Sequence, residues 1–167
     1  MDDQEVPVEK LDQCSHVCVF IGARPNVPKA ATIQRAFERE PFFSSGATSS
    51  IIHTGQHSNP NMGTRFAHNV GLRIDVSLGA EGGGTDAAAL GILMQEVGNF
   101  LLSRPRPSLV VVIGDVNSTV AAAIVSARLG IPVAHVEAGL RSGAIEPEEV
   151  NRRLFQVLQA FTLRRLV

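Results

Sequence analysis

The sequence predicts an α/β domain in which an open parallel sheet is covered by helices on both faces. Short apolar stretches typical of β-strands alternate along the chain with stretches whose apolar residues recur at helical spacing. The stretch at 109–113, LVVVI, is apolar at every position, which is expected of a central strand buried on both faces. A length of 167 residues with 44% hydrophobic content fits one such domain with its own core.

The first half of the chain shows two strand-to-helix units. Residues 16–21, HVCVFI, form a short apolar run that ends at Gly22, and a helix is expected over residues 28–39. A second strand is expected at 49–54, and a weaker helical pattern follows over 61–70. The order is therefore strand, helix, strand, helix.

The clearest amphipathic pattern lies in the middle of the chain. Glycine-rich residues 79–84 predict a loop, and the next helix is expected to begin at Thr85 as its N-cap. Its apolar residues share one helical face: Leu90, Leu93, Met94, Val97 and Leu101. The RPRP run at 104–107 ends this helix, because a residue that precedes proline disfavours the helical conformation. The strand at 109–113 follows.

The last third repeats the strand-to-helix order. An alanine-rich helix is expected over 118–129 and ends at Gly130, and a strand is expected at 132–136. A final helix carries apolar residues on one face: Val150, Leu154, Val157, Leu158 and Phe161. Together the elements predict a Rossmann-like sheet with right-handed crossovers, in which ligands bind beyond the carboxyl ends of the strands.

Composition and charge exclude several classes of partner. With 15 basic and 16 acidic residues the net charge is -1, so no broad positive surface is available for nucleic acid or an anionic membrane. No apolar run reaches the roughly 20 residues that span a bilayer, and no signal peptide is recognisable, which predicts a cytoplasmic protein. Residues 1–13 lack hydrophobic periodicity and predict a disordered leader, which leaves residues 14–167 as the domain.

The two cysteines, Cys14 and Cys18, predict no disulfide framework and no metal site. Cys18 lies inside the first strand, where cysteine behaves as a small buried hydrophobe. A zinc site would need two further ligands at suitable spacing, and the sequence offers none. A reducing compartment is therefore expected.

Basic and polar side chains follow the first two strands. Arg24 lies in the loop GARPN and Lys29 in the first turn of the next helix, where the helix N-terminus would favour a phosphate. The same two side chains also fit an ordinary exposed helix start. His57, in the TGQH that follows the second strand, is either a site residue or a structural or solvated histidine. The first loop lacks the GxGxxG pattern, so a dinucleotide fingerprint is absent.

Two carboxylates follow neighbouring strands later in the chain. Asp115 comes directly after the strand at 109–113, and Glu137 directly after the strand at 132–136. If these strands pair, the two residues begin about 5 Å apart, and like charges that close raise each other's pKa. One carboxyl group could then act as a general acid and the other as a base. Alternatively, Asp115 caps the helix that follows it.

A third acidic group begins the last helix. Glu148 and Glu149 lie in its first turn, where acidic residues stabilise the positive end of the helix dipole. That structural role is sufficient for at least one of them, while the other is available for chemistry.

In order and register, these motifs resemble the non-hydrolysing UDP-N-acetylglucosamine 2-epimerases. The resemblance rests on GARPN-x-x-K, TGQH, the strand followed by GD, HVEAGLRSG and PEE-x-NR, and it covers residues 17–161. The pair HVEAGLRSG and PEEVNRR is its most specific part. The resemblance implies one half of a two-domain architecture like that of glycosyltransferase-B enzymes, with the active site in the cleft between two Rossmann-like domains.

The resemblance also implies roles for individual residues. Three carboxylates would act as acid and base groups: Asp115, Glu137 and Glu148. Five side chains would bind the substrate: Arg24, Lys29, His57, His135 and Arg141. The family interconverts UDP-N-acetylglucosamine and UDP-N-acetylmannosamine by removing the C2 proton, expelling UDP and adding it back with inversion. No metal and no cofactor are implied.

The resemblance covers only the first of the two domains. The family's second domain carries a catalytic histidine and most nucleotide contacts, so this chain alone is expected to be inactive, and its ending, AFTLRRLV, predicts a truncated or frameshifted terminus. Two alternatives are a hydrolysing relative, which releases N-acetylmannosamine and UDP, and a non-catalytic module that pairs with another chain. A homodimer is a further expectation. A Rossmann oxidoreductase fits least, because the glycine fingerprint is absent.

Overall fold

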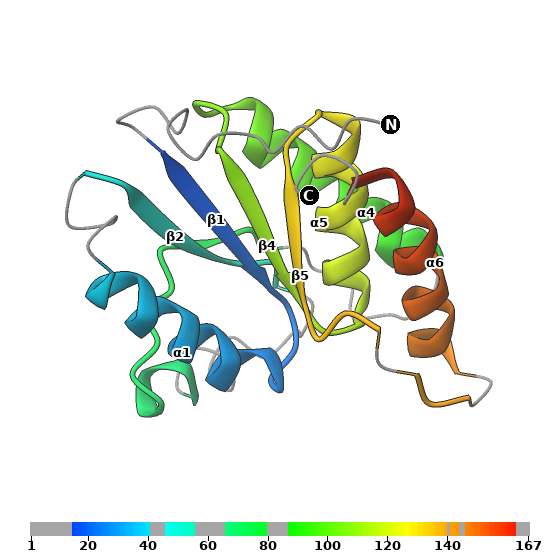
Figure 1. Ribbon diagram of the computed structural model, residues 1–167, viewed down its shortest axis with the longest axis horizontal. Helices are drawn as coiled ribbons and strands as arrows, with labels where there is room; N and C mark the ends of the chain where they lie inside the picture. Colours follow the sequence, from blue (N-terminus) through cyan, green and yellow to red (C-terminus); the bar gives the residue numbers. More distant parts are fainter. Residues whose placement is uncertain are drawn as a thin grey trace, which may run out of the picture.

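The computed structural model describes residues 15–40, 46–55, 66–79, 87–139, 141–143 and 146–162, with side chains up to residue 156. Within these ranges the chain forms one sheet of five parallel strands in the order β3-β2-β1-β4-β5 (Figure 1). The strands are β1 (His16–Ile21), β2 (Thr48–His53), β3 (Val76–Ser77), β4 (Leu109–Ile113) and β5 (Val133–Val136). The helices are α1 (Asn26–Arg39), α4 (Ala87–Leu102), α5 (Asn117–Arg128) and α6 (Pro147–Thr162). The open parallel α/β sheet predicted from the sequence is thereby confirmed.

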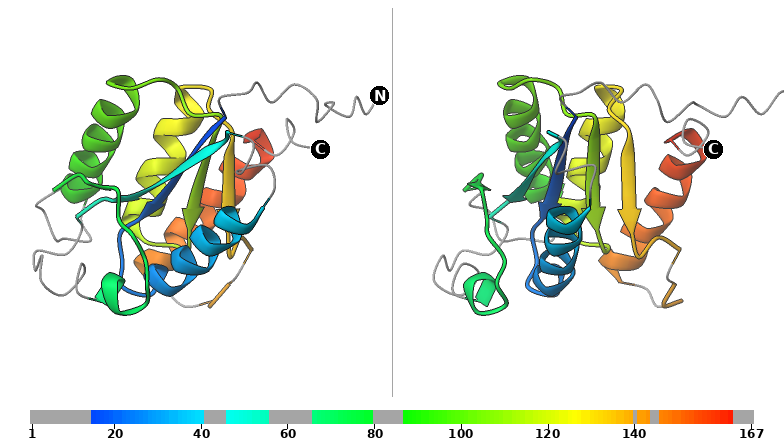
Figure 2. Two further views of the ribbon diagram at one scale, coloured as in Figure 1. Left: turned by 90° about the vertical axis from the view of Figure 1, so that its left-hand side faces the viewer. Right: turned by 60° about the vertical axis from the view of Figure 1, so that its left-hand side comes forward.

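The central strands β1 and β4 are buried on both faces because side chains alternate across a strand. On β1, Val17, Val19 and Ile21 face one core cluster, while Cys18 and Phe20 face the other. The first cluster packs under α1, and the second packs under α4 and α5. Figure 2 shows α1 on one side of the sheet and the pair α4 and α5 on the other.

Cys18 occupies the buried strand position that the sequence predicts. It is a free thiol with 3% of its surface exposed, and burial raises its pKa to about 11. The thiol therefore stays protonated and unreactive at neutral pH. No helix in the described ranges is both long and apolar enough to cross a membrane.

Helix α1 begins two residues before the sequence prediction. The Asn26 side chain accepts a hydrogen bond from the Ala23 N–H at 3.0 Å and donates one to the Ile113 carbonyl at 3.1 Å. Asn26 and Val27 also donate backbone hydrogen bonds back to Ala23 and Arg24. Because the loop is tied to β4 in this way, the chain turns into the helix earlier than the apolar periodicity indicates.

The second strand-to-helix unit is described only in part. Only residues 66–69 of the expected helix at 61–70 are helical in the described part, and residues 56–65 lie outside it. The two-residue strand β3, which pairs with β2, was not predicted, because two residues carry no periodic signal. Thr85, the expected N-cap of α4, also lies outside the described residues.

The inward face of α6 is partly polar. Val150 and Leu154, two members of the apolar face noted in the sequence, are 58% and 41% exposed. Between residues 147 and 156, where the side chains of this helix are described, the buried ones are Glu149, Asn151 and Phe155. The first turns of α6 therefore pack mainly through polar groups against the loop that follows β4, a contact that hydrophobic periodicity cannot reveal.

Candidate active site

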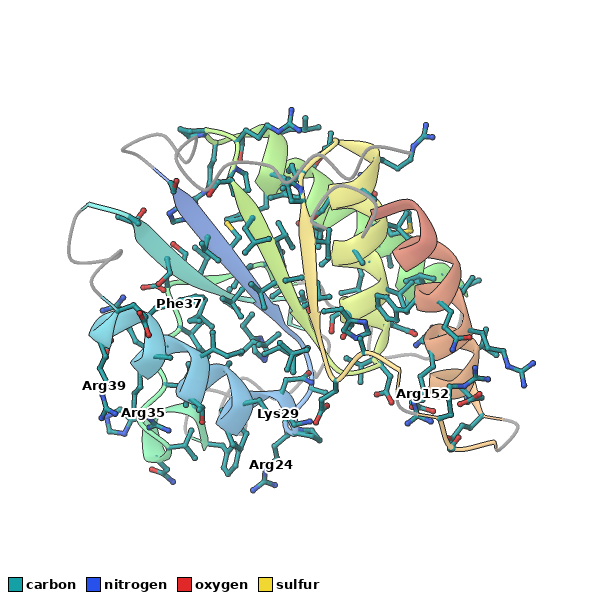
Figure 3. The ribbon with its side chains drawn as sticks, in the orientation of Figure 1. Arg24, Lys29, Arg35, Phe37, Arg39 and Arg152 are labelled. Carbon is teal, nitrogen blue, oxygen red and sulfur yellow. The ribbon has the colours of Figure 1, made fainter. Side chains whose placement is uncertain are left out.

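The site lies where β1, β4 and β5 end, at the edge of the sheet where the N-termini of α1, α5 and α6 meet. In Figure 3, Lys29 from α1 and Arg152 from α6 lie on either side of the loops that follow β4 and β5. This edge is where an open parallel sheet binds its ligands. The site is therefore assembled from three segments that are distant in sequence.

Asp115 and Glu137 lie side by side, as the sequence predicts. Strands β4 and β5 pair in parallel, with Ile113 opposite Val136, and the Gly114 N–H donates a hydrogen bond to the Val136 carbonyl at 3.1 Å. The two carboxylates thus leave adjacent strands within one or two residues of the last paired position.

The backbone at the end of both strands adopts the left-handed conformation. Gly114 has φ 76° and Glu137 has φ 71°, and Glu137 is the one non-glycine residue with positive φ in the described chain. This conformation costs a residue with a Cβ about 1 to 2 kcal/mol, and such strain gathers at functional sites. The turn brings the Glu137 carboxylate back over Gly114, where a Cβ would lie 3.8 Å from Glu137 Oε2.

Glu137 is paired with Lys29. Lys29 Nζ donates to Glu137 Oε2 at 2.6 Å, and about a third of each side chain remains exposed. Lys29 therefore reaches the site from the first turn of α1, and in this structure its ammonium group binds a carboxylate. An incoming ligand can compete for either partner because both remain accessible.

Asp115 is paired with Arg152. Arg152 Nε and Nη2 both reach Asp115 Oδ2, at 2.7 Å and 2.5 Å, and the Asn151 amide donates to the Asp115 carbonyl at 2.7 Å. The N-cap residue of α5 is Val116, and no side chain caps that helix. Asp115 therefore does not cap α5, and its carboxylate binds Arg152 at the ends of the strands instead.

His135 holds the same loop from the side of β5. Its Nε2 lies 2.6 Å from the Gly114 carbonyl, which can only accept, so Nε2 carries the proton. Its ring packs on Phe155 with centroids 4.1 Å apart, and its Nδ1 is buried without a hydrogen-bond partner among the described residues. Burial lowers the pKa of His135, an effect that the Gly114 carbonyl and the nearby carboxylates oppose. The neutral imidazole thus acts as a clamp on the backbone before Asp115.

The acidic pair at the start of α6 divides into a buried and an accessible residue. Glu149 is 2% exposed and binds Arg141, whose Nε donates to Oε1 at 2.7 Å. Hydrogen bonding from Arg141 is the main cause that lowers the pKa of Glu149 to about 2, and the Ser142 N–H and Arg152 also contribute. Glu148 is partly exposed, so of the two residues it is the one that a ligand can reach.

The remaining predicted residues differ in how closely the protein holds them. Arg24 is exposed and its guanidinium lies 4.5 Å from the centroid of the Phe66 ring, a cation–π contact at the rim of the site. Arg141 also donates from Nη1 to Gln156 at 2.9 Å, so its guanidinium is committed to protein partners. His57 lies outside the described residues.

A shallow hollow opens between these groups. Its polar lining comes from Asp115, His135, Glu137, Arg152 and Gln156, and Gly114, Gly139 and Phe155 complete it. Two carboxylates, each next to its own cation, therefore border one space. Within the described ranges, no group of three or more His, Cys, Asp or Glu side chains could hold a metal ion.

Several supporting residues were missed by the sequence analysis. Asn26, Asn151 and the close packing at Gly22 all fix the loops, yet none carries the charge that drew attention to its neighbours. A signal was present for Glu149, because Glu149 and Arg152 are spaced three residues apart and therefore share a helix face. Amide side chains that clamp distant backbone groups leave no such local pattern.

An open parallel sheet with carboxylates and cationic side chains gathered at the carboxyl ends of its strands places the chain in the class of Rossmann-like α/β proteins, which bind their ligands at this edge. The family model for UDP-N-acetylglucosamine 2-epimerase matches residues 43–163. The chain is 38% identical over 140 residues to the UDP-2,3-diacetamido-2,3-dideoxy-D-glucuronate 2-epimerase of Pseudomonas aeruginosa, covering 83% of this chain and 38% of the relative. It is 36% identical over 147 residues to the UDP-N-acetylglucosamine 2-epimerase of Methanocaldococcus jannaschii, covering 86% and 38%.

Solved structures of UDP-N-acetylglucosamine 2-epimerases also resemble this chain. The Methanocaldococcus jannaschii UDP-GlcNAc 2-epimerase in complex with UDP-GlcNAc and UDP superposes with a TM-score of 0.74 at 33% identity, over 91% of this chain and 44% of that chain. A UDP-N-acetylglucosamine 2-epimerase from Listeria monocytogenes gives 0.74 at 29% identity, over 86% and 37%. The chain belongs to the UDP-N-acetylglucosamine 2-epimerase family. It spans less than half the length of these relatives.

Proposed function

We propose that this chain supplies the acid and base groups of an enzyme that epimerises UDP-N-acetylglucosamine at C2 to give UDP-N-acetylmannosamine. The observation that carries the proposal is the pair Asp115 and Glu137 on adjacent strand ends, each next to a cation from a different helix. The activity for which the relatives are named supports the reaction and the substrate class.

The proposed reaction uses these groups in a balanced sequence. One carboxylate takes the proton from C2 while the bond from C1 to the diphosphate oxygen breaks, which yields a 2-acetamidoglucal and UDP. UDP then returns to C1, and a carboxyl group delivers a proton to the opposite face of C2. A weakly acidic C–H needs a positioned base, and the departing diphosphate needs positive charge beside it.

The ion pair between Lys29 and Glu137 gives Lys29 a role in the departure of the diphosphate. When the carboxylate of Glu137 takes up a proton, its attraction for Lys29 falls, and the ammonium group becomes available to the departing diphosphate. Glu148 is proposed as a third acid/base group, since it is partly exposed in the first turn of α6. Arg24, His57, His135 and Arg141 are proposed to contribute to substrate binding, with His135 acting through its clamp on Gly114.

Two further expectations belong to the whole protein. Because the relatives are more than twice as long as the matched part, we propose that the rest of such a protein holds most of the nucleotide. The 167-residue chain alone should then show no turnover. We also propose a cytoplasmic location and a UDP-sugar substrate, and sedimentation equilibrium would decide whether the chain forms a homodimer.

A chimera tests the proposed activity. The chain is joined to the part of the Methanocaldococcus jannaschii relative that it does not match, and UDP-N-acetylglucosamine is supplied in D2O. We expect UDP-N-acetylmannosamine with deuterium at C2, and we expect Asp115→Asn and Glu137→Gln each to lower kcat by at least about 100-fold. The matched control is Glu96→Gln, a carboxylate on α4 far from the site. Turnover by the 167-residue chain alone, or near-parental rates in both site variants, would contradict the proposal.

One observation favours a second substrate. The Pseudomonas aeruginosa relative, named for UDP-2,3-diacetamido-2,3-dideoxy-D-glucuronate, is 38% identical to this chain. The same chimera is therefore assayed with that sugar nucleotide, and the ratio of kcat/KM values identifies the preferred substrate. Product analysis separates epimerisation from hydrolysis, since a hydrolysing enzyme would release free N-acetylmannosamine and UDP.

A further inference from the structure

Glu149 lies among basic side chains at the beginning of α6 and is not part of the hollow. Its Oε1 accepts from Arg141, and its Oε2 accepts from the Ser142 N–H at 3.2 Å and lies 3.4 Å from Arg152 Nη1. A buried carboxylate with several donors has one fixed orientation, because any rotation would leave charge unpaired in the interior. Glu149 is therefore a rigid anchor point for the groups around it.

Arg152 joins this anchor to Asp115. Its Nη1 faces Glu149, while its Nε and Nη2 bind Asp115 Oδ2. A guanidinium is planar, and its donors point in fixed directions, so a contact at one end determines what the other end can reach. The position of the Asp115 carboxylate thus depends on the partner at the far end of Arg152.

A second carboxylate, Glu146, also touches Arg152 Nη1, at 3.2 Å. Its side chain is 39% exposed, compared with 3% for Glu149. An exposed ion pair contributes little because water and salt screen it and the side chain remains free to move. Glu149 is in addition held by Arg141 and Ser142, so the buried residue decides the orientation of Arg152.

We propose that Glu149 is a positioning residue, which holds Arg152 against Asp115 and thereby fixes the carboxylate for proton transfer. Its importance for catalysis rests on the proposed function, but the contact itself can be tested without turnover. This role also explains why the two acidic residues at the start of α6 differ so strongly in burial: Glu149 is closed into the helix packing, and Glu148 is left accessible.

The test is NMR spectroscopy of the 167-residue chain, with the arginine Nε–H groups and the Asp115 side-chain carboxyl carbon as probes. In Glu149→Gln we expect hydrogen exchange at Arg152 Nε to accelerate by about tenfold and the Asp115 carboxyl signal to shift. Glu148→Gln, one residue away in the same turn, serves as the control and leaves both signals as in the parent.

Two outcomes would overturn the proposal. Exchange at Arg152 Nε that stays at the parental rate in folded Glu149→Gln would do so. So would a change confined to Arg141, since Glu149 would then only anchor the loop. Should Glu149→Gln not fold, Glu149→Asp keeps the charge but withdraws the carboxylate by one methylene group, and parental exchange at Arg152 in that variant refutes the proposal equally. An inactive chimera would count against the proposed function and leave the NMR result unaffected.

Discussion

Space, rather than backbone conformation, is what requires a glycine at position 22. Its φ is not positive, but a Cβ built on it would lie 2.0 Å from Ser118 Oγ and 2.8 Å from Thr54 Oγ1. The end of β1 therefore touches the first turn of α5 with no room for a side chain. Close backbone approach of this kind is a common reason for glycine at a strand end.

Gly22→Ala should consequently destabilise the chain. A methyl group at this position forces the first turn of α5 away from β1, and overpacking of this kind costs about 1 to 3 kcal/mol. Urea unfolding measures the loss. Gly91→Ala is the matched control, because Gly91 lies in α4 with open space around it, and there alanine should stabilise by about 0.5 to 1 kcal/mol. Equal effects at the two glycines would show that space at Gly22 is not the constraint.

His135 makes stability depend on pH in a definite direction. Burial lowers its pKa below 6.5 in the folded state, so just below that pH the unfolded chain binds more protons than the folded chain. The contribution of His135 to the free energy of unfolding is therefore complete above about pH 6.5. It is lost as the pH falls through the folded-state pKa of His135. The pKa of His16 is lowered in the same direction, again mainly by burial.

Urea unfolding at pH values between about 8 and about 5 measures this dependence. His135→Gln keeps a donor for the Gly114 carbonyl but cannot titrate, so its stability should change less with pH than that of the parent. His16→Asn retains a partner for Thr48 Oγ1. It should remove the part of the pH dependence of the free energy of unfolding that comes from His16. An unchanged slope in His135→Gln would refute the assignment.

Among the secondary-structure elements, those with dense apolar patterns were predictable from the sequence. Strand β4 has the predicted bounds, because five consecutive apolar residues between turn-forming segments indicate a buried strand in an α/β chain. The inward-facing residues of α6 were not predictable in this way, because its described packing depends on Asn151 and Glu149 rather than on Val150 and Leu154. Polar packing depends on partners elsewhere in the chain, and a single helix does not reveal them.

The docking of α6 should accordingly depend on Asn151. Its amide donates to the Asp115 carbonyl at 2.7 Å and to Asn117 Oδ1 at 3.2 Å, and its side chain is buried. Asn151→Ala leaves both acceptors without this donor and should cost about 1 to 3 kcal/mol in urea unfolding. Val150→Ala, at the adjacent exposed position, should stay within about 0.5 kcal/mol of the parent. A larger loss at Val150 than at Asn151 would restore the apolar face as the docking surface.

Across the whole molecule, the site combines what the sequence can and cannot predict. The proximity of Asp115 and Glu137 followed from the pairing of sequential strands. Their cations could not be assigned in the same way, because Lys29 is 108 residues from Glu137 and Arg152 is 37 residues from Asp115. Tertiary packing brings three helix N-termini to one edge of the sheet, and only the folded chain defines which cation meets which carboxylate.

Acid unfolding tests how far this charge network stabilises the whole fold. As the pH falls, the 16 acidic residues are neutralised while 15 Lys and Arg and five His repel one another. Hydrogen bonding from Arg141 lowers the pKa of Glu149 from 4.5 to about 2, so its contribution to stability is complete above about pH 4.5 and is lost as the pH falls toward 2. Glu149→Gln should be less stable than the parent at neutral pH and should lose less stability over that window. Glu148→Gln is the control, and its free energy of unfolding should change with pH as that of the parent does. If the free energy of unfolding of Glu149→Gln also changes with pH as in the parent, the buried carboxylate does not link folding to pH.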